Sequence, residues 1–251
     1  MNILVLLKQT FDTEEKIEIV NGEVSEEGIK FIINPYDEYA VEEAVSIKEN
    51  HGGEVTVLTL GPSRAEEALR TALAMGADKA VLIEGEDLNG DEYVISKILA
   101  SYIKGKNYDL IIGGYMAVDD GSAQVGPRVA EELEIPHVAT IVKLNLQDSK
   151  AIVERDVEGN KEVIEVGLPA LFTSQQGLNE PRFPSIPNIM KAKRKPLERL
   201  AISGLNLSEE DLKAKTEFVH RFLPSKKEAG RILQGSLQEQ AKELVELLKL
   251  A

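Results

Sequence analysis

The sequence predicts an α/β protein built on a parallel sheet with helices on both faces. Short apolar runs alternate with amphipathic stretches through the first half of the chain, and each run is rich in leucine and β-branched residues. Strands separated by helices require crossover connections, which make a sheet parallel. Runs that are apolar throughout, rather than at every second residue, are typical of strands covered on both faces.

The composition excludes several kinds of site and partner. The chain has 251 residues, enough for one large α/β domain or two small ones. Its formal net charge of −14 repels nucleic-acid phosphates and anionic lipid, so we expect neither as a partner. There is no cysteine, which excludes disulfides, thiolate metal sites and cysteine nucleophiles. The histidines lie far apart without metal-ligand spacing, so no metal site is predicted.

The first apolar run, Ile3–Leu7, bears on localisation. It is too short for a signal peptide and lacks a basic lead-in. No segment approaches the length of a transmembrane helix. We therefore expect a cytoplasmic protein without stable membrane insertion.

Four buried strands and three helices are predicted in the first half. The strands are Ile3–Leu7, Val55–Leu60, Ala80–Ile83 and Leu110–Ile112. The helices are Tyr39–Lys48, Arg64–Met75 and Val94–Ile103. In a parallel sheet, ligands bind in loops at the carboxyl ends of the strands. The loops after Leu7, Leu60 and Ile112 are therefore candidates for a site.

The second half begins with a small antiparallel addition. Its predicted strands are Thr140–Leu146, Ala151–Glu154 and Val163–Val166, with a hairpin turn at residues 156–160. Prolines 181, 184 and 187 then predict an extended loop, because proline disrupts helix interiors and central strands. The tail is predicted to end in a helix whose apolar face is formed by Leu237, Ala241, Leu244, Leu247 and Leu248.

The strongest candidate for a ligand site is residues 113–128. This segment leaves a buried strand through two glycines, which allow close backbone approach. A helix is expected over residues 123–133, capped by Ser122 or Asp120, and its free amides favour an anion such as phosphate. An ordinary capped helix after a turn is an equally good interpretation of the local sequence. No lysine is placed to clamp a triphosphate, so ATP hydrolysis is not expected.

A second candidate is the turn formed by residues 34–37. Asp37 is expected to cap the helix that starts at Tyr39. The functional alternative is that Asn34 hydrogen-bonds a base or ribose while Tyr36 lies against an aromatic ring.

The third candidate is residues 178–193, which we call the 178–193 segment. Phe183, Ile186, Ile189 and Met190 project from it and expose apolar surface unless a partner or the protein's own domain covers them. The lysines that follow are typical of a solvated face, in agreement with the net charge.

Three stretches resemble a known family. LNEPRFPSIPNIMKAK, the 178–193 segment, resembles the recognition loop of electron-transfer flavoprotein beta subunits. INPYDEYAVEEAV and RTALAMGADKAV are similar to two further signatures of that family. The resemblance covers essentially the whole chain.

The resemblance implies a fold, a partner and a role. The fold is similar to that of the adenine-nucleotide alpha-hydrolases, and the partner is a larger alpha subunit that holds the redox FAD. The chain is then an electron-carrier subunit, not an enzyme. The dimer takes electrons from dehydrogenases, commonly the acyl-CoA dehydrogenases of fatty acid oxidation. It passes them towards the quinone pool through a quinone oxidoreductase.

The resemblance also implies a structural AMP in this subunit. The implied pocket residues are Leu6, Asn34, Pro35, Tyr36, Asp37, Leu60, Gly114, Ala117, Val118, Asp119, Asp120, Gly121, Ser122, Ala123, Gln124 and Val125. The implied docking residues for dehydrogenases are Phe183, Ile186, Ile189 and Met190, with Ile186 as the anchor. Residues 1–199 would form the nucleotide-binding domain, and residues 200–251 a C-terminal arm that contacts the alpha subunit.

Two alternatives stay open. Bifurcating members of the family oxidise NADH and hold a second FAD in place of AMP. Ala123–Pro127 resembles their sequence, whereas the Asp119–Asp120 pair resembles the AMP-binding members. The same fold also makes nucleotide-sensing modules without electron transfer, which would leave the 178–193 segment unexplained.

Overall fold

The computed structural model describes residues 1–86, 88, 90–227 and 229–249. Two compact units are present. One comprises residues 1–16 and 26–218, and the other joins residues 17–25 with the C-terminal segment from residue 219. Over the described ranges, no helix combines the length and apolar character that a membrane crossing requires.

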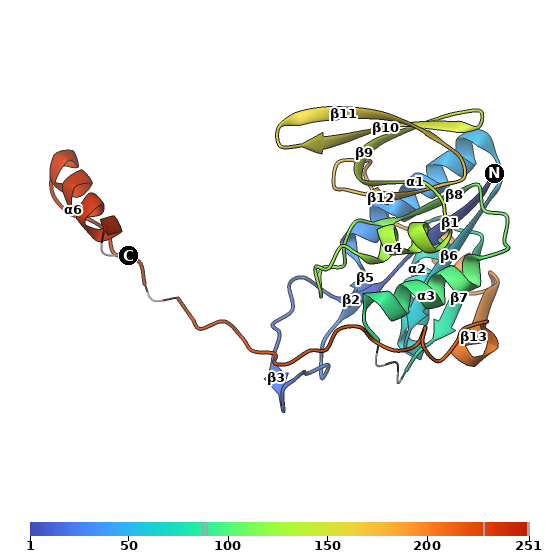
Figure 1. The fold of residues 1–251 in the computed structure, drawn as a ribbon, viewed down its shortest axis with the longest axis horizontal. Helices are drawn as coiled ribbons and strands as arrows, with labels where there is room; N and C mark the ends of the chain where they lie inside the picture. The colour runs from blue at the N-terminus through green and yellow to red at the C-terminus, as the bar shows by residue number, and fades with distance from the viewer. Residues whose placement is uncertain (87, 89, 228, 250–251) are drawn as a thin grey trace. The chain divides into compact units, whose positions relative to one another are not determined.

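Within the described residues, a nine-stranded sheet forms the centre of the first unit (Figure 1). The strand order is β11-β10-β9-β12-β8-β1-β6-β7-β13. The bounds are β1 (Asn2–Leu6), β6 (Glu54–Gly61), β7 (Lys79–Glu84), β8 (Leu110–Gly114), β9 (His137–Gln147), β10 (Lys150–Val157), β11 (Asn160–Gly167), β12 (Ala170–Ser174) and β13 (Leu197–Ala201). In the spatial order β9-β12-β8-β1-β6-β7-β13, all neighbouring strands pair in parallel. β10 pairs antiparallel with β9, and β11 pairs antiparallel with β10.

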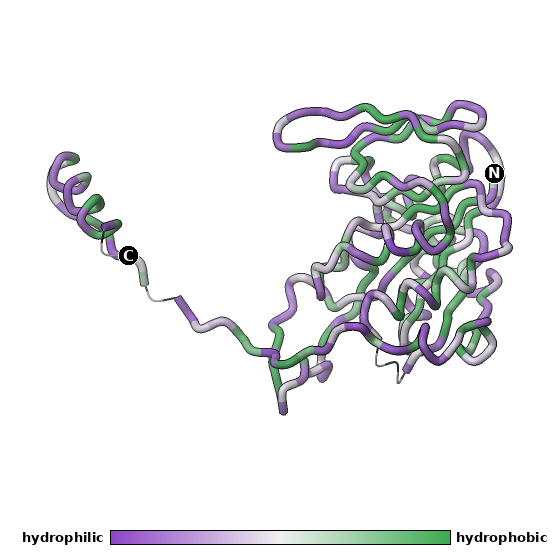
Figure 2. The backbone as a smooth tube through the Cα atoms, viewed as in Figure 1, coloured by the Kyte–Doolittle hydropathy of each residue, from purple (hydrophilic) through white to green (hydrophobic). Residues whose placement is uncertain are grey.

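Helices cover both faces of this sheet. The helices of this unit are α1 (Pro35–His51), α2 (Glu66–Met75), α3 (Glu92–Ile103), α4 (Val125–Glu132) and α5 (Ile186–Ala192), with 3-10 turns η1 (Ser63–Ala65) and η2 (Ile202–Gly204). Ile3 and Val5 of β1 pack in a core with α1 and α2, while Leu4 and Leu6 pack in a second core with α3 and α4. Successive side chains of a strand point to opposite faces, so β1 contributes to both cores. The apolar strands stand out in Figure 2.

The remaining elements are small. β2 (Gln9–Phe11) pairs antiparallel with β5 (Phe31–Ile33) in the first unit. In the second unit, β3 (Ile19–Val20) pairs with β4 (Glu23–Val24). The second unit also contains α6 (Leu237–Lys249), the predicted C-terminal helix.

The predicted fold class is confirmed. All four strands and all three helices expected in the first half are present, with shifted ends. The antiparallel addition is present as β9, β10 and β11. Its hairpin turn is centred on Glu158 and Gly159, whose positive φ values of 47° and 82° suit the tight turns that join twisted strands.

The predicted start of the first helix is wrong. α1 begins at Pro35 rather than Tyr39. Proline suits the first helical position, because its fixed φ is helical and its missing N–H would have had no partner there. Asp37 therefore lies inside the first turn, and Asn34 has the N-cap position.

The predicted cap of the helix after β8 is also wrong. α4 begins at Val125, and Gln124 has the N-cap position without a side-chain cap hydrogen bond. Asp120 instead accepts a hydrogen bond from the N–H of Ser122 within the preceding loop. Ala123, expected to be helical, has a φ of 55°. The local turn chemistry of aspartate competes here with helix capping.

The proline-rich segment is extended only as far as Ser185. α5 follows, with Pro187 in its first turn, so the prediction of a loop fails over α5. Proline is excluded from helix interiors but not from a first turn. Ser185 caps α5 by accepting a hydrogen bond from the N–H of Asn188 at 3.4 Å.

Two strands of the central sheet, β12 and β13, were not predicted from the sequence. β12 lies between β8 and β9, and all five of its residues are buried. β13 pairs in parallel with β7, and its charged sequence has no strand periodicity. The expected boundary after residue 199 lies inside β13, and the first compact unit continues to Phe218.

Gly76 ends α2 and gives a direct test of this packing. Its φ is 142°, and an added Cβ would lie 2.7 Å from Cγ1 of Val45 on α1. We expect Gly76→Ala to lower the free energy of unfolding by about 2–4 kcal/mol, through backbone strain and overpacking. Gly167→Ala is the control, because a Cβ there meets nothing within 4 Å. Equal urea midpoints for the two variants would contradict the predicted contact between α1 and the end of α2.

Candidate functional site

The candidate site lies where the strand order reverses. β1 has β6 on one side and β8 on the other. The chain adds β6 and β7 first and then crosses to β8, so the loops after β1 and β8 run apart. Open α/β sheets bind ligands in the crevice that such a reversal leaves at the carboxyl ends of the strands. We call this crevice the β1–β8 cleft.

Asp37 joins the two strands that separate at this cleft. The backbone N–H of Lys8, just after β1, donates to its Oδ2 at 2.6 Å, and the N–H of Gly114, at the end of β8, donates to its Oδ1 at 2.8 Å. The carboxylate thus satisfies two backbone donors where the strands diverge. A Cβ on Gly114 would lie 2.3 Å from Oδ1 of Asp37, so glycine is required for this approach.

The buried position of Asp37 controls its ionisation. Loss of contact with water raises the pKa of its carboxyl from 3.8 to about 7. Hydrogen bonds from Lys8, Asn34 and Gly114 lower the pKa and oppose part of this rise. Asp37 therefore titrates close to neutral pH, although its neighbours favour the charged form.

Asn34 shapes the loop that follows β8. Its Nδ2 donates to the carbonyl of Met116 at 2.9 Å, and its Oδ1 accepts from the N–H of Val118 at 3.1 Å. Because Asn34 is buried, both ends of its amide serve to position this loop. The ring of Tyr36 lies against Tyr115 of the same loop in an edge-on arrangement, with 4.5 Å between ring centroids.

The β1–β8 cleft brings most of the expected pocket residues together. It contains about 780 Å³ of empty space, a figure that includes open solvent, and apolar side chains form most of its walls. The expected residues that line it are Leu6, Asn34, Asp37, Leu60, Gly114, Ala117, Asp120, Ser122, Ala123, Gln124 and Val125. Pro35, Tyr36, Val118, Asp119 and Gly121 are not among its lining residues.

Several lining residues were not expected from the sequence. They are Leu7, Lys8, Leu58, Ile95, Leu99, Leu171 and Thr173. Gly113, Tyr115, Met116 and Gly126 also line the cleft, and they belong to the candidate segment 113–128 although they were not singled out within it. Ile95 and Leu99 belong to α3, and Leu171 and Thr173 to β12, so only the tertiary fold brings them here. Lys8 had a signal in the sequence, because it follows a strand that ends at a candidate loop.

Lys8 is the cation of the cleft. Its Nζ lies 2.8 Å from Oδ1 of Asp119 and 2.8 Å from Oδ2 of Asp120. Burial lowers the pKa of Lys8, but the two carboxylates outweigh it, so the net effect raises the pKa. No lysine was predicted to clamp a triphosphate, and in the structure the ammonium of Lys8 contacts these two aspartates.

The 178–193 segment is fixed to α1 at its beginning. The guanidinium of Arg182 forms hydrogen bonds of 2.7–3.1 Å with the carboxylates of Glu42 and Glu49. Asn179 donates from Nδ2 to Glu43 at 2.9 Å. The planar guanidinium fork suits such multiple contacts and restricts the geometry of the segment.

The end of the same segment is fixed to α2. Arg70 on α2 donates to the carbonyls of Ala192 and Lys195, each at 3.0 Å. The Nζ of Lys195 donates in return to the carbonyls of Leu73 and Ala77 at the end of α2. Arg70 therefore binds carbonyls at and just beyond the end of α5, while Lys195, just beyond the segment, binds carbonyls at the end of α2, where a cation is favoured.

Between these two attachments, the four expected docking residues are exposed. Phe183 is 97% and Ile186 78% exposed, while Ile189 and Met190 are also classed as exposed. An apolar group held outward on a fixed backbone is typical of a binding surface rather than of a core. Among the described residues, no group of three or more His, Cys, Asp or Glu side chains is arranged to hold a metal ion.

The chain is similar to known proteins over nearly its whole length. A model of the electron transfer flavoprotein domain matches residues 21–205. The chain is 57% identical over 251 residues to the electron transfer flavoprotein subunit beta of Bacillus subtilis (strain 168), covering 99% of this chain and 98% of that protein. It is 42% identical over 263 residues to the caffeyl-CoA reductase-Etf complex subunit CarD of Acetobacterium woodii, covering 99% and 98%. It is 37% identical to the mitochondrial electron transfer flavoprotein subunit beta of Arabidopsis thaliana, covering 95% of each.

The titration of Asp37 predicts a pH dependence of stability. Because its pKa is about 7 in the folded protein and ordinarily 3.8, the folded state binds more protons between these values, and this group's contribution falls as pH rises. Asp37→Asn removes that dependence. We expect the free energy of unfolding of the unchanged protein, relative to the variant, to fall by roughly 3–5 kcal/mol from pH 4 to pH 7. The free energies are measured by urea unfolding. If the difference between the two proteins does not change with pH, burial does not raise the pKa of Asp37 as described here.

Proposed function

This chain belongs to the electron-transfer flavoprotein family as a beta subunit, and on that premise we propose how it works. It binds one AMP in the β1–β8 cleft as a structural ligand. It pairs with a larger alpha subunit whose FAD carries the electrons. It presents the 178–193 segment to dehydrogenases, commonly acyl-CoA dehydrogenases, and the dimer passes electrons through a quinone oxidoreductase towards the quinone pool.

The position of the cleft is the observation that supports nucleotide binding. The cleft lies at the reversal of strand order, and it joins apolar walls to a small set of polar groups. Leu58, Leu60 and Leu99 offer apolar surface to a base. The loop before α4 offers backbone amides and Lys8 offers a positive charge, which together suit a phosphate.

A bound flavin, rather than this chain's side chains, supplies the redox chemistry. The sequence contains neither cysteine nor tryptophan. Electron transfer in proteins of this kind is carried by the cofactor, and the protein binds and orients it. The chain is therefore an electron-transfer subunit and not a classical enzyme.

The C-terminal arm, residues 200–251, is proposed to contact the alpha subunit. α6 has large apolar side chains that are exposed, among them Leu237, Leu244 and Leu248. A helix with an apolar face is stable when another surface covers that face. The cytoplasmic location expected from the sequence remains part of this proposal.

A second candidate function places FAD in the β1–β8 cleft and makes the complex bifurcating, with NADH as donor. It is favoured by Ala123–Pro127, which resembles the bifurcating members of the family. The nucleotide-sensing alternative is not supported by a family match over residues 21–205 or by the exposed 178–193 segment.

Nucleotide extraction distinguishes the two candidates. The heterodimer is purified after co-expression with its alpha subunit, and the released nucleotides are separated and quantified. We expect equal amounts of AMP and FAD, because the cleft takes AMP and the alpha subunit takes FAD. FAD in both sites without AMP would overturn the AMP proposal and make NADH-dependent bifurcation the leading function.

Ile186→Ala tests the docking proposal. Burial of an anchor of this size contributes about 1.5–3 kcal/mol, so the variant is expected to raise the apparent Michaelis constant for the dehydrogenase roughly tenfold or more. Val163→Ala is the matched control, since Val163 is an apolar residue on β11 that is 64% exposed and outside the 178–193 segment. Flavin content serves as the check on folding. Unchanged kinetics in Ile186→Ala would remove this residue from the docking surface.

A further inference from the structure

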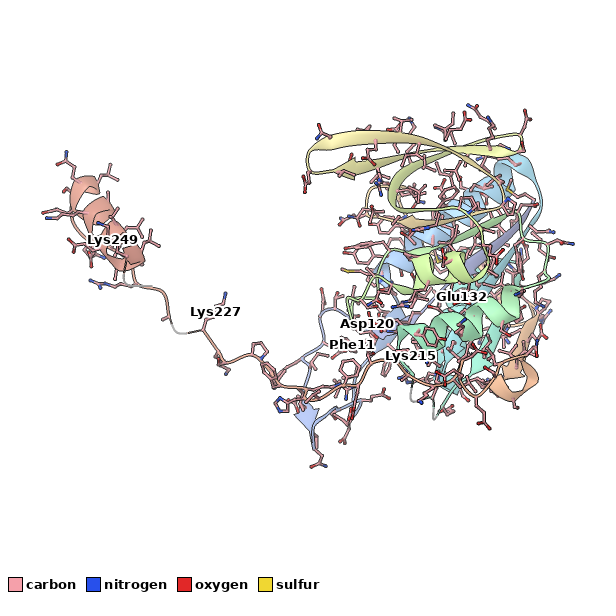
Figure 3. The ribbon with its side chains drawn as sticks, viewed as in Figure 1. Phe11, Asp120, Glu132, Lys215, Lys227 and Lys249 are labelled. Carbon is pink, nitrogen blue, oxygen red and sulfur yellow. The ribbon has the colours of Figure 1, made fainter. Side chains whose placement is uncertain are left out.

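In the loop between β8 and α4, the carboxylate of Asp120 accepts hydrogen bonds from two groups that could bind a phosphate. Oδ1 of Asp120 accepts a hydrogen bond from the backbone N–H of Ser122 at 2.8 Å, and Oδ2 accepts one from Nζ of Lys8 at 2.8 Å. Figure 3 labels Asp120 on this loop. A backbone N–H and an ammonium that converge on one anion are the donors with which proteins commonly bind phosphate.

The neighbouring Asp119 differs in one contact. Its Oδ1 also accepts from Nζ of Lys8 at 2.8 Å. In the described part of the chain, the N–H of Ser122 donates to Asp120 and not to Asp119. Asp120 also lines the β1–β8 cleft, whereas Asp119 does not. The two adjacent carboxylates therefore share a cation, but only Asp120 occupies the anion position inside the cleft.

The charges of this group oppose a second anion. Burial raises the pKa of Asp120, but Lys8 and the hydrogen bonds of Ser122 outweigh it, so the net effect lowers the pKa. Two carboxylates then face one ammonium. A phosphate that entered beside them would meet a net negative charge. Phosphate binding would be favoured only if Lys8 and the N–H of Ser122 left Asp120 and donated to the phosphate instead.

The loop has room for that exchange. Asp119, Asp120 and Gly121 are exposed. A Cβ added to Gly121 would meet nothing within 4 Å, so no neighbour is packed against this side of the turn. The Asp120 side chain is itself 30% exposed, so a change to another staggered rotamer can turn its carboxylate towards solvent. Lys8, in contrast, is held at its backbone, where its N–H donates to Asp37.

We propose that the carboxylate of Asp120 stands in for the phosphate of the nucleotide, and that Lys8 and the N–H of Ser122 pass from Asp120 to that phosphate when the nucleotide binds. The inference rests on the nucleotide function proposed above. It makes Lys8 a phosphate-binding residue and Asp120 an internal competitor that lowers the affinity of the cleft for phosphorylated ligands.

The test compares AMP with adenosine, which lacks the phosphate. Both are titrated by calorimetry into the full chain after removal of bound nucleotide. Asp120→Asn is expected to tighten AMP binding by about tenfold and Lys8→Met to weaken it by about tenfold, the effect of gaining or losing roughly one charge-assisted contact. Neither variant is expected to change adenosine binding. Asp119→Asn is the matched comparison: it removes one charge from Lys8 but leaves the N–H of Ser122 on Asp120, so it should tighten AMP binding by less than Asp120→Asn does.

Three results would contradict the proposal. Unchanged or weaker AMP binding by Asp120→Asn overturns the competition, because Asp120 would then be neutral or a ligand. Equal losses of AMP and adenosine binding in Lys8→Met overturn the phosphate role of Lys8 and leave a structural one. If the unchanged chain binds neither ligand, the proposed nucleotide function fails and this inference fails with it.

Discussion

The hydrogen bonds of Asp37 are the constraint on which the β1–β8 cleft depends. Where β1 and β8 separate, each strand leaves a backbone N–H without a partner in the sheet, and one carboxylate accepts from both. This arrangement requires a helix that brings an acid to the sheet and a glycine that lets the acid approach. Because α1 begins at Pro35, its first turn brings Asp37 to the sheet. Gly114 is the glycine that lets the carboxylate approach. The cleft is therefore a consequence of how the fold satisfies two buried donors.

The same helix connects the cleft to the surface proposed for docking. The first turn of α1 carries Asp37, while Glu42 and Glu43 farther along it hold Arg182 and Asn179 of the 178–193 segment. α1 is thus fixed to β1 and β8 at one end, and near its middle to the start of the 178–193 segment. Its core-facing residues are almost fully buried, so it joins these regions as a rigid element. A structural nucleotide beside the first turn would stabilise this arrangement by binding the folded state.

The sequence predicted the central strands and helices because their periodicities are strong. It also predicted half of the residues that line the cleft, since loops after parallel strands meet at one edge. It did not predict β12, although this strand is as long as β1 and β8 and fully buried. It also did not predict β13, whose charged sequence becomes a strand by pairing with β7. The contribution of α3 to the cleft depends on tertiary packing in the same way. Lys8 was missed for another reason: its role depends on Asp119 and Asp120, more than a hundred residues away in the chain.

Residue-resolved hydrogen–deuterium exchange on the full chain, with and without AMP, tests the central claim most directly. If the β1–β8 cleft is the nucleotide site, AMP should slow exchange at Lys8, Gly114 and the amides of residues 122–125. The hairpin of β10 and β11, outside the cleft, should exchange at an unchanged rate. Unchanged exchange in the loops after β1 and β8, at AMP concentrations that saturate the chain, would contradict the assignment of this cleft.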